Sequence, residues 1–170
     1  MKKIWAPWRM TYIRGQKEDG CVFCQISGQK KDEENLILHA GEHTLVLMNR
    51  FPYNNGHLMV IPRRHCTDVE SLEAREIEEL FNLLKLSIRV LTASLAPDGY
   101  NVGINLGKAA GAGMEHLHLH VVPRWSGDSN FMPVLSDTRV IPEFVETTYR
   151  KLHLAFQEVL GRAGGGGRQT

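Results

Sequence analysis

The chain has 170 residues, with 20 basic and 19 acidic side chains and a formal net charge of +1. This length fits one domain that buries about 70% of its unfolded surface without a disulfide framework. The balanced charge provides no extended positive field, so nucleic acid is not an expected partner.

The N-terminal segment MKKIWAPWRMTYIRG is basic, but Pro7 and Arg9 interrupt any apolar core of a signal peptide. No apolar run of about 18 residues occurs elsewhere, so we expect no membrane span. These features predict a cytoplasmic protein. Cys21 and Cys24 follow as a CxxC pair, which indicates reduced thiols or metal ligands in a reducing compartment. Cys66 fits a small buried hydrophobic residue.

Three short strands are predicted next. The apolar runs LILH, HTLVLMN and HLMVIP are separated by Gly41 and by the turn-forming PYNNG. Short connections favour antiparallel neighbours, so these runs predict a meander. The expected strands cover residues 36–39, 43–49 and 57–62.

Two amphipathic helices are predicted, from Ser71 to Ala96 and from Pro142 to Leu160. The first has glutamates near its start and PDG after its end, while the second has a proline in its first turn and Gly161 as its stop. We expect the apolar stripes of both helices to pack into the core. The stripes consist of Ile77, Leu80, Phe81, Leu84, Ile88, Leu91 and Leu95, and of Val145, Tyr149, Leu152, Phe156 and Val159.

Two further strands, Tyr100–Leu106 and His116–Pro123, are joined by the glycine-rich GKAAGAGM and predict a hairpin with a functional loop. In the second strand three histidines alternate with apolar residues, and proline ends the run. Successive side chains point to opposite faces, so the histidines share one face, roughly 6–7 Å apart. That spacing suits one metal ion reached by bent side chains, or one ligand contacted at several points; three unrelated surface histidines are the alternative. The histidines are His116, His118 and His120.

These elements together predict an α+β fold. An antiparallel sheet carries the histidines on one face and packs the helix of residues 71–96 against the other, with a C-terminal helix after it. No internal repeat or domain boundary is visible. We therefore expect a single domain over residues 1–160 and a flexible glycine-rich tail over residues 161–170.

The alternating motif HLHLHVV resembles the pattern of the histidine triad (HIT) family, and so do NRFPYNNGHLMVIP before it and INLGKAAGAG between. The resemblance covers roughly residues 20–125 and implies a HIT-like fold. In this family the second histidine attacks a nucleotide α-phosphate and forms a nucleotidyl-histidine intermediate, which implies His118 as the nucleophile. A neutral imidazole is competent for this attack near neutral pH. The resemblance further implies His120 as a hydrogen-bond donor to phosphate or leaving group, and His57 as a fourth histidine beside the triad.

A nucleotide site is also implied by the resemblance. Asn49 matches the family's ribose-binding position, and Asn105 matches the amide that contacts phosphate. Glycines would let backbone N–H groups turn toward phosphate oxygens. Many family hydrolases have Gln-Ser or Gln-Thr before the triad, where this chain has Ala112-Gly113, so a side-chain hydroxyl is missing. The loop glycines are Gly107, Gly111 and Gly113, and the base-pocket positions, which fit core packing equally well, are Phe23, Ile26 and Met59.

One subgroup of the family binds zinc through a CxxC pair, a histidine after an IP-x-x segment and the first triad histidine. The matching residues here are Cys21, Cys24, His65 and His116. Two thiolates and two imidazoles form a closed tetrahedral set, which is typical of structural zinc. The CxxC pair alone would equally fit a redox pair.

The flanks WAPWRMTYI and PRWSGDSNFMP, residues 5–13 and 123–133, resemble the branch that includes diadenosine tetraphosphate phosphorylases and related hydrolases. The resemblance implies a homodimeric enzyme that cleaves adenosine nucleotides, mainly diadenosine polyphosphates, with phosphate or water resolving the intermediate. Trp5, Trp8 and Trp125 also fit aromatic anchors of the chain ends.

Three other functions remain alternatives. The first is a nucleotide-binding regulatory module with little turnover. The second is a zinc enzyme that uses the triad itself as its metal site. The third is a uridylyltransferase, which is disfavoured because Leu119 stands where that relative has proline.

Overall fold

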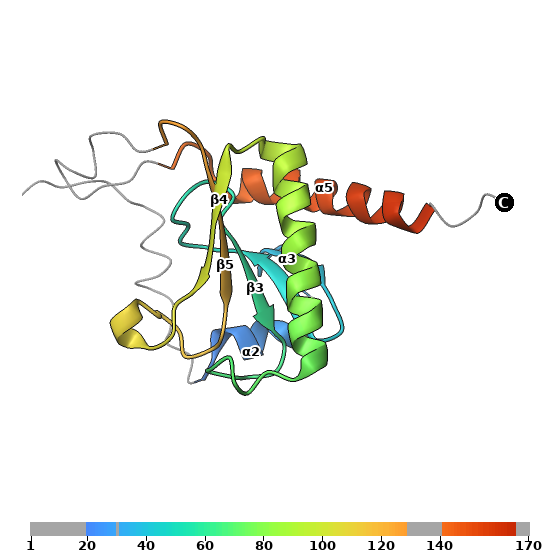
Figure 1. Cartoon of the computed structure of the whole chain (residues 1–170). Helices are drawn as coiled ribbons and strands as arrows, with labels where there is room; N and C mark the ends of the chain where they lie inside the picture. Colours follow the sequence, from blue (N-terminus) through green and yellow to red (C-terminus); the bar gives the residue numbers. More distant parts are fainter. Residues whose placement is uncertain (1–19, 30, 129–140, 166–170) are drawn as a thin grey trace, which may run out of the picture.

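The computed structural model describes residues 20–29, 31–128 and 141–165. Its centre is a five-stranded antiparallel sheet in the order β1-β2-β3-β5-β4 (Figure 1). The predicted α+β class, meander and hairpin are therefore confirmed. The strands are β1 (Ile37–Ala40), β2 (Thr44–Met48), β3 (Leu58–Pro62), β4 (Gly99–Ile104) and β5 (Leu119–Arg124). The helices are α2 (Val22–Ser27), α3 (Ala74–Leu95), the short 3-10 helix η1 (Lys108–Ala110) and α5 (Val145–Gly165).

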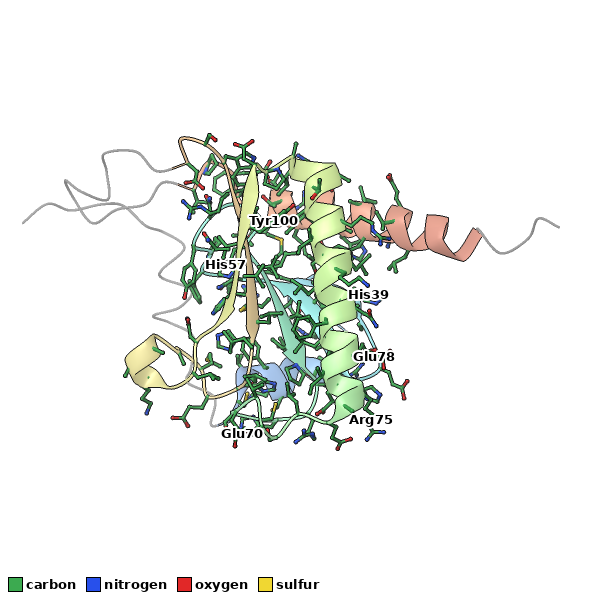
Figure 2. All side chains as sticks on the ribbon, viewed as in Figure 1. His39, His57, Glu70, Arg75, Glu78 and Tyr100 are labelled. Carbon is green, nitrogen blue, oxygen red and sulfur yellow. The ribbon has the colours of Figure 1, made fainter. Side chains whose placement is uncertain are left out.

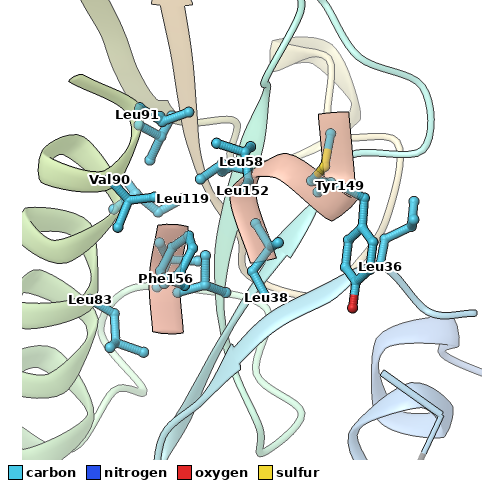
Figure 3. Packing of buried hydrophobic residues seen from close by; sticks show 14 of the residues in the cluster. Leu36, Leu38, Leu58, Leu83, Val90, Leu91, Leu119, Tyr149, Leu152 and Phe156 are labelled. Carbon is cyan, nitrogen blue, oxygen red and sulfur yellow. The ribbon is translucent and has the colours of Figure 1, made fainter. Parts of the chain in front are cut away.

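The two faces of the sheet bury different clusters. Helices α3 and α5 cover one face, where Leu119 packs with Val90 and Phe156 (Figures 1 and 3). On the other face, Phe23 of α2 packs against Met59 and its neighbours in β1, β2 and β3. Alternation along each strand divides its side chains between these clusters. The α2 side is the face that carries the candidate site.

Helix α3 differs from its prediction at its start and on its surface. It begins after Glu73 because Glu73 and Glu76 form a capping box, in which the Glu76 carboxylate accepts the backbone N–H of Glu73 at 2.9 Å. Ile77 and Phe81, expected in the core, are 40% and 56% exposed. The sheet contacts a narrower band of the helix than the apolar stripe covers, so these two side chains lie outside it. Leu83 occupies the buried side instead.

Helix α5 begins at Val145 and not at Pro142, and it continues through Gly161 to Gly165. A single glycine lowers helix propensity by about 1 kcal/mol, which is too little to end a helix that is already packed. Its predicted apolar face is confirmed. The buried residues of this face are Tyr149, Leu152 and Phe156, with Val145 and Val159 partly buried beside them.

The strand predicted from His116 is shorter than expected, because β5 begins at Leu119. Only His120 of the three histidines lies within the strand. At its other end β5 continues through Pro123, where the prediction ended it. Strand β3 pairs with β5 only as far as Val121, so the proline lies where β5 has one neighbouring strand and its missing N–H is tolerated.

Among the described residues, no helix combines the length and apolar character needed to cross a membrane. The segment of residues 5–13 with Trp5 and Trp8, and residues 129–133 of the second flank, lie outside the described part of the chain.

Candidate active site and metal centre

All three triad histidines are buried, but their rings join two different clusters. The His116 ring lies beside the thiols of the CxxC pair, 3.2 Å from Cys21 Sγ. The His118 and His120 rings contact each other edge to face, with centroids 4.7 Å apart. The three side chains therefore lie on one side of the sheet, as predicted, but His116 belongs to a cluster with the thiols and the other two histidines belong to a second cluster.

His57, labelled in Figure 2, precedes β3 and forms a hydrogen-bonded pair with His120. The distance from His57 Nε2 to His120 Nδ1 is 2.9 Å. The backbone N–H of Tyr53 donates to His57 Nδ1 at 3.0 Å. Because that N–H can only donate, the neutral His57 ring carries its proton on Nε2 and donates it to His120. His120 then carries its own proton on Nε2, away from His57.

Burial keeps this histidine pair neutral. Desolvation, with smaller contributions from the neighbouring His120 and His118, lowers the pKa of His57 to about 3. Burial likewise lowers the pKa of His120 to about 4, with a smaller contribution from His118. Both rings are therefore neutral at pH 7, as the chain of hydrogen bonds requires.

His118 is oriented by the main chain of the residue two before it. Its Nδ1 donates to the carbonyl oxygen of His116 at 2.6 Å. A carbonyl only accepts, so the proton of a neutral His118 lies on Nδ1 and its Nε2 keeps a lone pair. The ring also contacts Phe23, with centroids 5.7 Å apart. This geometry presents an unprotonated nitrogen next to a histidine N–H.

The two predicted asparagines both lie at the His57–His120 pair. Asn49 Oδ1 accepts the backbone N–H of Phe51 at 2.9 Å, and its Nδ2 lies 3.3 Å from His57 Nδ1. Asn105 follows β4, and its side-chain amide group lies 3.5 Å from His120 Nε2. The structure therefore brings both side chains to the histidines.

The glycine-rich loop between β4 and β5 has two residues in left-handed conformation. Gly107 and Gly111 have φ of +79° and +88°, which disfavour any residue with a Cβ. Gly113 does not share this conformation. No described protein atom lies within 4 Å of a Cβ built on Gly107 or Gly113, so this part of the loop faces open space.

The three predicted base-pocket residues lie in or against the apolar cluster on the α2 side of the sheet. Phe23 and Met59 are buried members of this cluster, and Ile26 is partly buried against it. Their burial fits core packing, and the contact between Phe23 and the His118 ring fits a wall of the site equally well.

Sequence reasoning missed a pocket of about 410 Å³ on the histidine face. It is lined by Pro52, Tyr53, Asn101, Val122 and Arg124. A signal for two of these residues was present, because Val122 and Arg124 continue the two-residue alternation beyond His120.

A hydrogen-bonded network holds the loop of residues 51–56 against the end of β5. Asp128 accepts two bonds from Arg124, at 2.6 and 2.7 Å, and a third from Asn54 at 2.8 Å. The Arg124 guanidinium holds the pKa of the Asp128 carboxyl well below its usual range. Asn54 also donates to the carbonyl of Pro123. The network therefore positions the loop that supplies the Tyr53 N–H to His57.

The four predicted metal ligands meet in one cluster. The ligand atoms of Cys21, Cys24, His65 and His116 all lie within 4.8 Å of one another. Cys24 Sγ lies 3.3 Å from His65 Nδ1 and 3.6 Å from His116 Nδ1. Zinc bonds of about 2.0–2.3 Å place neighbouring ligands of a tetrahedron about 3.3–3.8 Å apart, so the donor set and its spacing fit zinc.

Hydrogen bonds around the cluster orient His116 and hold the residue next to His65. His116 Nε2 donates to the carbonyl of Pro62 at 2.9 Å, which leaves Nδ1 to face the thiols. Arg64, next to His65, makes two bonds to the buried Glu76 carboxylate at 3.0 and 2.7 Å. Cys66 is buried and stands outside the ligand set, as expected.

Comparisons with known proteins agree with this geometry. A family model described as "HIT domain" matches residues 30–127. The chain is 38% identical over 162 residues to the AP-4-A phosphorylase of Mycobacterium tuberculosis, an alignment that covers 89% of this chain and 83% of the relative. A solved Zn-bound histidine triad family protein from Mycobacterium smegmatis is similar with a TM-score of 0.68 and 32% identity, over 84% of this chain and 97% of that one. A hypothetical histidine triad nucleotide-binding protein from Sulfolobus tokodaii has the same TM-score at 25% identity, over 88% and 100% of the two chains.

Proposed function

This chain belongs to the HIT domain family, and we propose that it is an enzyme that cleaves diadenosine tetraphosphate or related adenosine nucleotides through a nucleotidyl-histidine intermediate on His118. The observation that carries the proposal is the hydrogen bond from His118 Nδ1 to the His116 carbonyl, which leaves a lone pair on Nε2. The similarity to an AP-4-A phosphorylase over 89% of the chain supports the substrate class.

In the proposed first step, His118 Nε2 attacks the α-phosphorus and forms the N–P bond. The P–O bond to the polyphosphate breaks, and the leaving oxygen accepts a hydrogen bond or proton from His120 Nε2. His57 holds His120 in the tautomer that can donate. We propose that Asn105, which lies beside His120, and the N–H groups at Gly107, Gly111 and Gly113 contact phosphate oxygens.

Asn49 has capacity left for the proposed ribose contact. An amide side chain offers two acceptor lone pairs and two N–H donors, and the contacts to Phe51 and His57 use one of each. One lone pair and one N–H therefore remain for ribose hydroxyls. We place the base against Phe23, Ile26 and Met59, because Phe23 contacts the His118 ring.

The second step decides the class of enzyme. Water would release AMP, whereas inorganic phosphate would release ADP. We propose phosphate as the acceptor, because the AP-4-A phosphorylase similarity extends across most of the chain and because Ala112-Gly113 replaces the polar pair of many hydrolases. The test incubates the purified protein with diadenosine tetraphosphate, with and without phosphate, and identifies the products. ATP plus ADP formed only with phosphate is expected; ATP plus AMP under both conditions would make the protein a hydrolase.

We propose a structural zinc ion on Cys21, Cys24, His65 and His116. Four protein ligands complete a tetrahedron and leave no position for a reactive water, so the ion would supply rigidity and not chemistry. The ligands would connect the start of α2, the segment after β3 and the segment before β5.

We further propose that the protein is a homodimer. Among the described residues, β4 lies at one end of the sheet with Val102 exposed. Ile77 and Phe81 add exposed apolar surface on α3. A second copy of the chain would cover both features. Scattering in dilute solution should give the mass of a dimer, and a fully active monomer would contradict this proposal.

A further inference from the structure

The open pocket begins where the catalytic histidines end. Val122 and Arg124 alternate with His120 along β5, so all three side chains leave the sheet on the same side. Val122 lies two residues, or about 7 Å, beyond His120. The Tyr53 ring joins pocket and histidines, because its centroid lies 4.7 Å from that of His57 and 5.4 Å from that of His120.

The two ends of the histidine row differ in accessibility. Beside His118, Phe23 is buried in the apolar cluster. Beyond His120, the pocket of about 410 Å³ is open, and Tyr53 on its wall is 46% exposed. A substrate with two large halves requires space on both sides of the reacting phosphorus. The pocket next to His120 provides such a space on one side of the histidines.

The lining of the pocket suits a flat heterocycle more than a free phosphate group. Tyr53 offers an aromatic ring, and nucleobases bind aromatic rings by stacking. Arg124 is paired with Asp128, so its charge is locally balanced. Its Nη1 also donates to Asn101 Oδ1 at 2.8 Å, which directs the amide so that its NH₂ group is the end not engaged by Arg124. An aromatic face with amide donors beside it can bind a nucleobase by stacking and hydrogen bonding.

We propose that this pocket binds the leaving nucleoside of a dinucleoside polyphosphate, the half that departs when His118 becomes adenylylated. The inference rests on the function proposed above and adds a second subsite to it. The phosphates of the leaving group would span the distance from His120 to the pocket. Binding of this half would favour a dinucleotide over a substrate with the same adenylyl group and a small leaving group.

The test compares two substrates that share the adenylyl half. One is diadenosine tetraphosphate, and the other is adenosine 5′-phosphoramidate, whose leaving group is ammonia. Val122→Trp fills the pocket, and Asn101→Ala removes the amide at an exposed position. Leu154→Trp, on the exposed side of α5, is the matched control for an added indole.

We expect Val122→Trp to lower the ratio of kcat/KM for the dinucleotide over the phosphoramidate by at least about tenfold, since it removes the stacking site. Asn101→Ala should lower the same ratio about threefold, as for one lost hydrogen bond. Both effects should appear in KM for the dinucleotide, and Leu154→Trp should leave the ratio unchanged. If Val122→Trp does not fold, as judged by thermal melting, Asn101→Ala carries the test.

Two outcomes separate the failure of this inference from failure of the proposed function. If the wild-type protein cleaves both substrates and the pocket variants slow them equally, the leaving nucleoside does not bind here and only the inference is overturned. If the wild-type protein cleaves neither substrate, the proposed function fails and the second subsite fails with it.

Discussion

His116 and His118 are both buried and stand two residues apart, yet their rings present opposite nitrogens to their surroundings. His116 donates a hydrogen bond from Nε2 to the Pro62 carbonyl, and its Nδ1 faces the thiols. His118 donates from Nδ1 to a carbonyl oxygen and keeps a lone pair on Nε2. One ring belongs to a cluster that fits a metal, and the other belongs to a cluster that fits nucleophilic chemistry.

The difference shows that neither motif nor burial decides what a histidine can do. What a histidine can do depends on the group that accepts a hydrogen bond from one of its ring nitrogens. That group fixes which of the two nitrogens keeps a lone pair and where the lone pair points. In this chain backbone groups provide the partner in both cases. The predictions below test whether the two clusters are separate in function.

The largest effect is expected for His118→Ala, which removes the proposed nucleophile. Turnover of diadenosine tetraphosphate should be abolished, because the proposed intermediate forms on the unprotonated Nε2 that this substitution removes. Zinc content and melting temperature should stay near those of the wild type, as measured by metal analysis and thermal unfolding. Full activity in this variant would overturn the mechanism.

His120→Ala should come next, with a loss of about 10²–10⁴ in kcat, the range for a missing general acid. The nucleophile is still present, so the adenylylated protein should still form, only more slowly. Rapid quenching followed by mass measurement of the intact chain would detect it. Adduct formation at the wild-type rate in this variant would show that His120 does not assist the leaving group.

On the metal side, wild-type protein purified without chelator should contain about one zinc ion per chain, and Cys21→Ala should contain none. A ligand present at 100 times its Kd stabilises the folded state by about 2.7 kcal/mol, which corresponds to a melting temperature about 5–10 °C higher for a chain of this size. The variant should therefore melt lower by about that amount. Cys66→Ala is the matched control, since this thiol is buried outside the ligand set. An unchanged melt and no zinc in the wild type would leave the thiols as a redox pair or as core.

The effect that is smallest at neutral pH is a pH dependence of stability from the histidine pair, which grows as the pH falls. The pKa of His57 is about 3 in the folded protein, below its ordinary value of 6.5, so the unfolded chain binds the proton first as pH falls. Stability is therefore complete above about pH 6.5 and is lost between there and about pH 3, by up to about 1.4 kcal/mol per pH unit for one histidine. Urea unfolding of wild type and His57→Gln over this range measures the slope. The substitution should flatten it, and an equal slope in both proteins would show that His57 is not the group responsible.

Much of this arrangement could be predicted from the chain itself. Alternation at His116, His118 and His120 placed the three rings on one side, and the resemblance separated His116 from the other two before any geometry was known. The start of β5 at Leu119 could not be predicted. His116, in the segment before it, contacts Cys21 at the start of α2 and Pro62 at the end of β3, and these long-range contacts are not visible in the local sequence pattern.

Periodicity also could not place Ile77 and Phe81 outside the core. It gives the angular position of a side chain on a helix, but the width of the contact depends on what packs against it. Two of the residues that line the pocket could be predicted, since Val122 and Arg124 continue the alternation of β5. The position of Tyr53 in the pocket could not be predicted, because Tyr53 lies on a loop that hydrogen bonds of Asn54 to Pro123 and Asp128 hold in place.

The hydrogen bond from the Tyr53 main chain to His57 limits what side-chain substitutions can reveal about this site. It sets the protons on two rings, yet every amino acid except proline supplies the same N–H at this position. Alanine scanning would remove the aromatic ring from the pocket and leave the proton arrangement intact. Position 53 can therefore change its side chain to suit a different substrate while the neighbouring chemistry persists. Only Tyr53→Pro, or replacement of that amide by an ester, would reveal how much of the catalysis rests on a single backbone hydrogen.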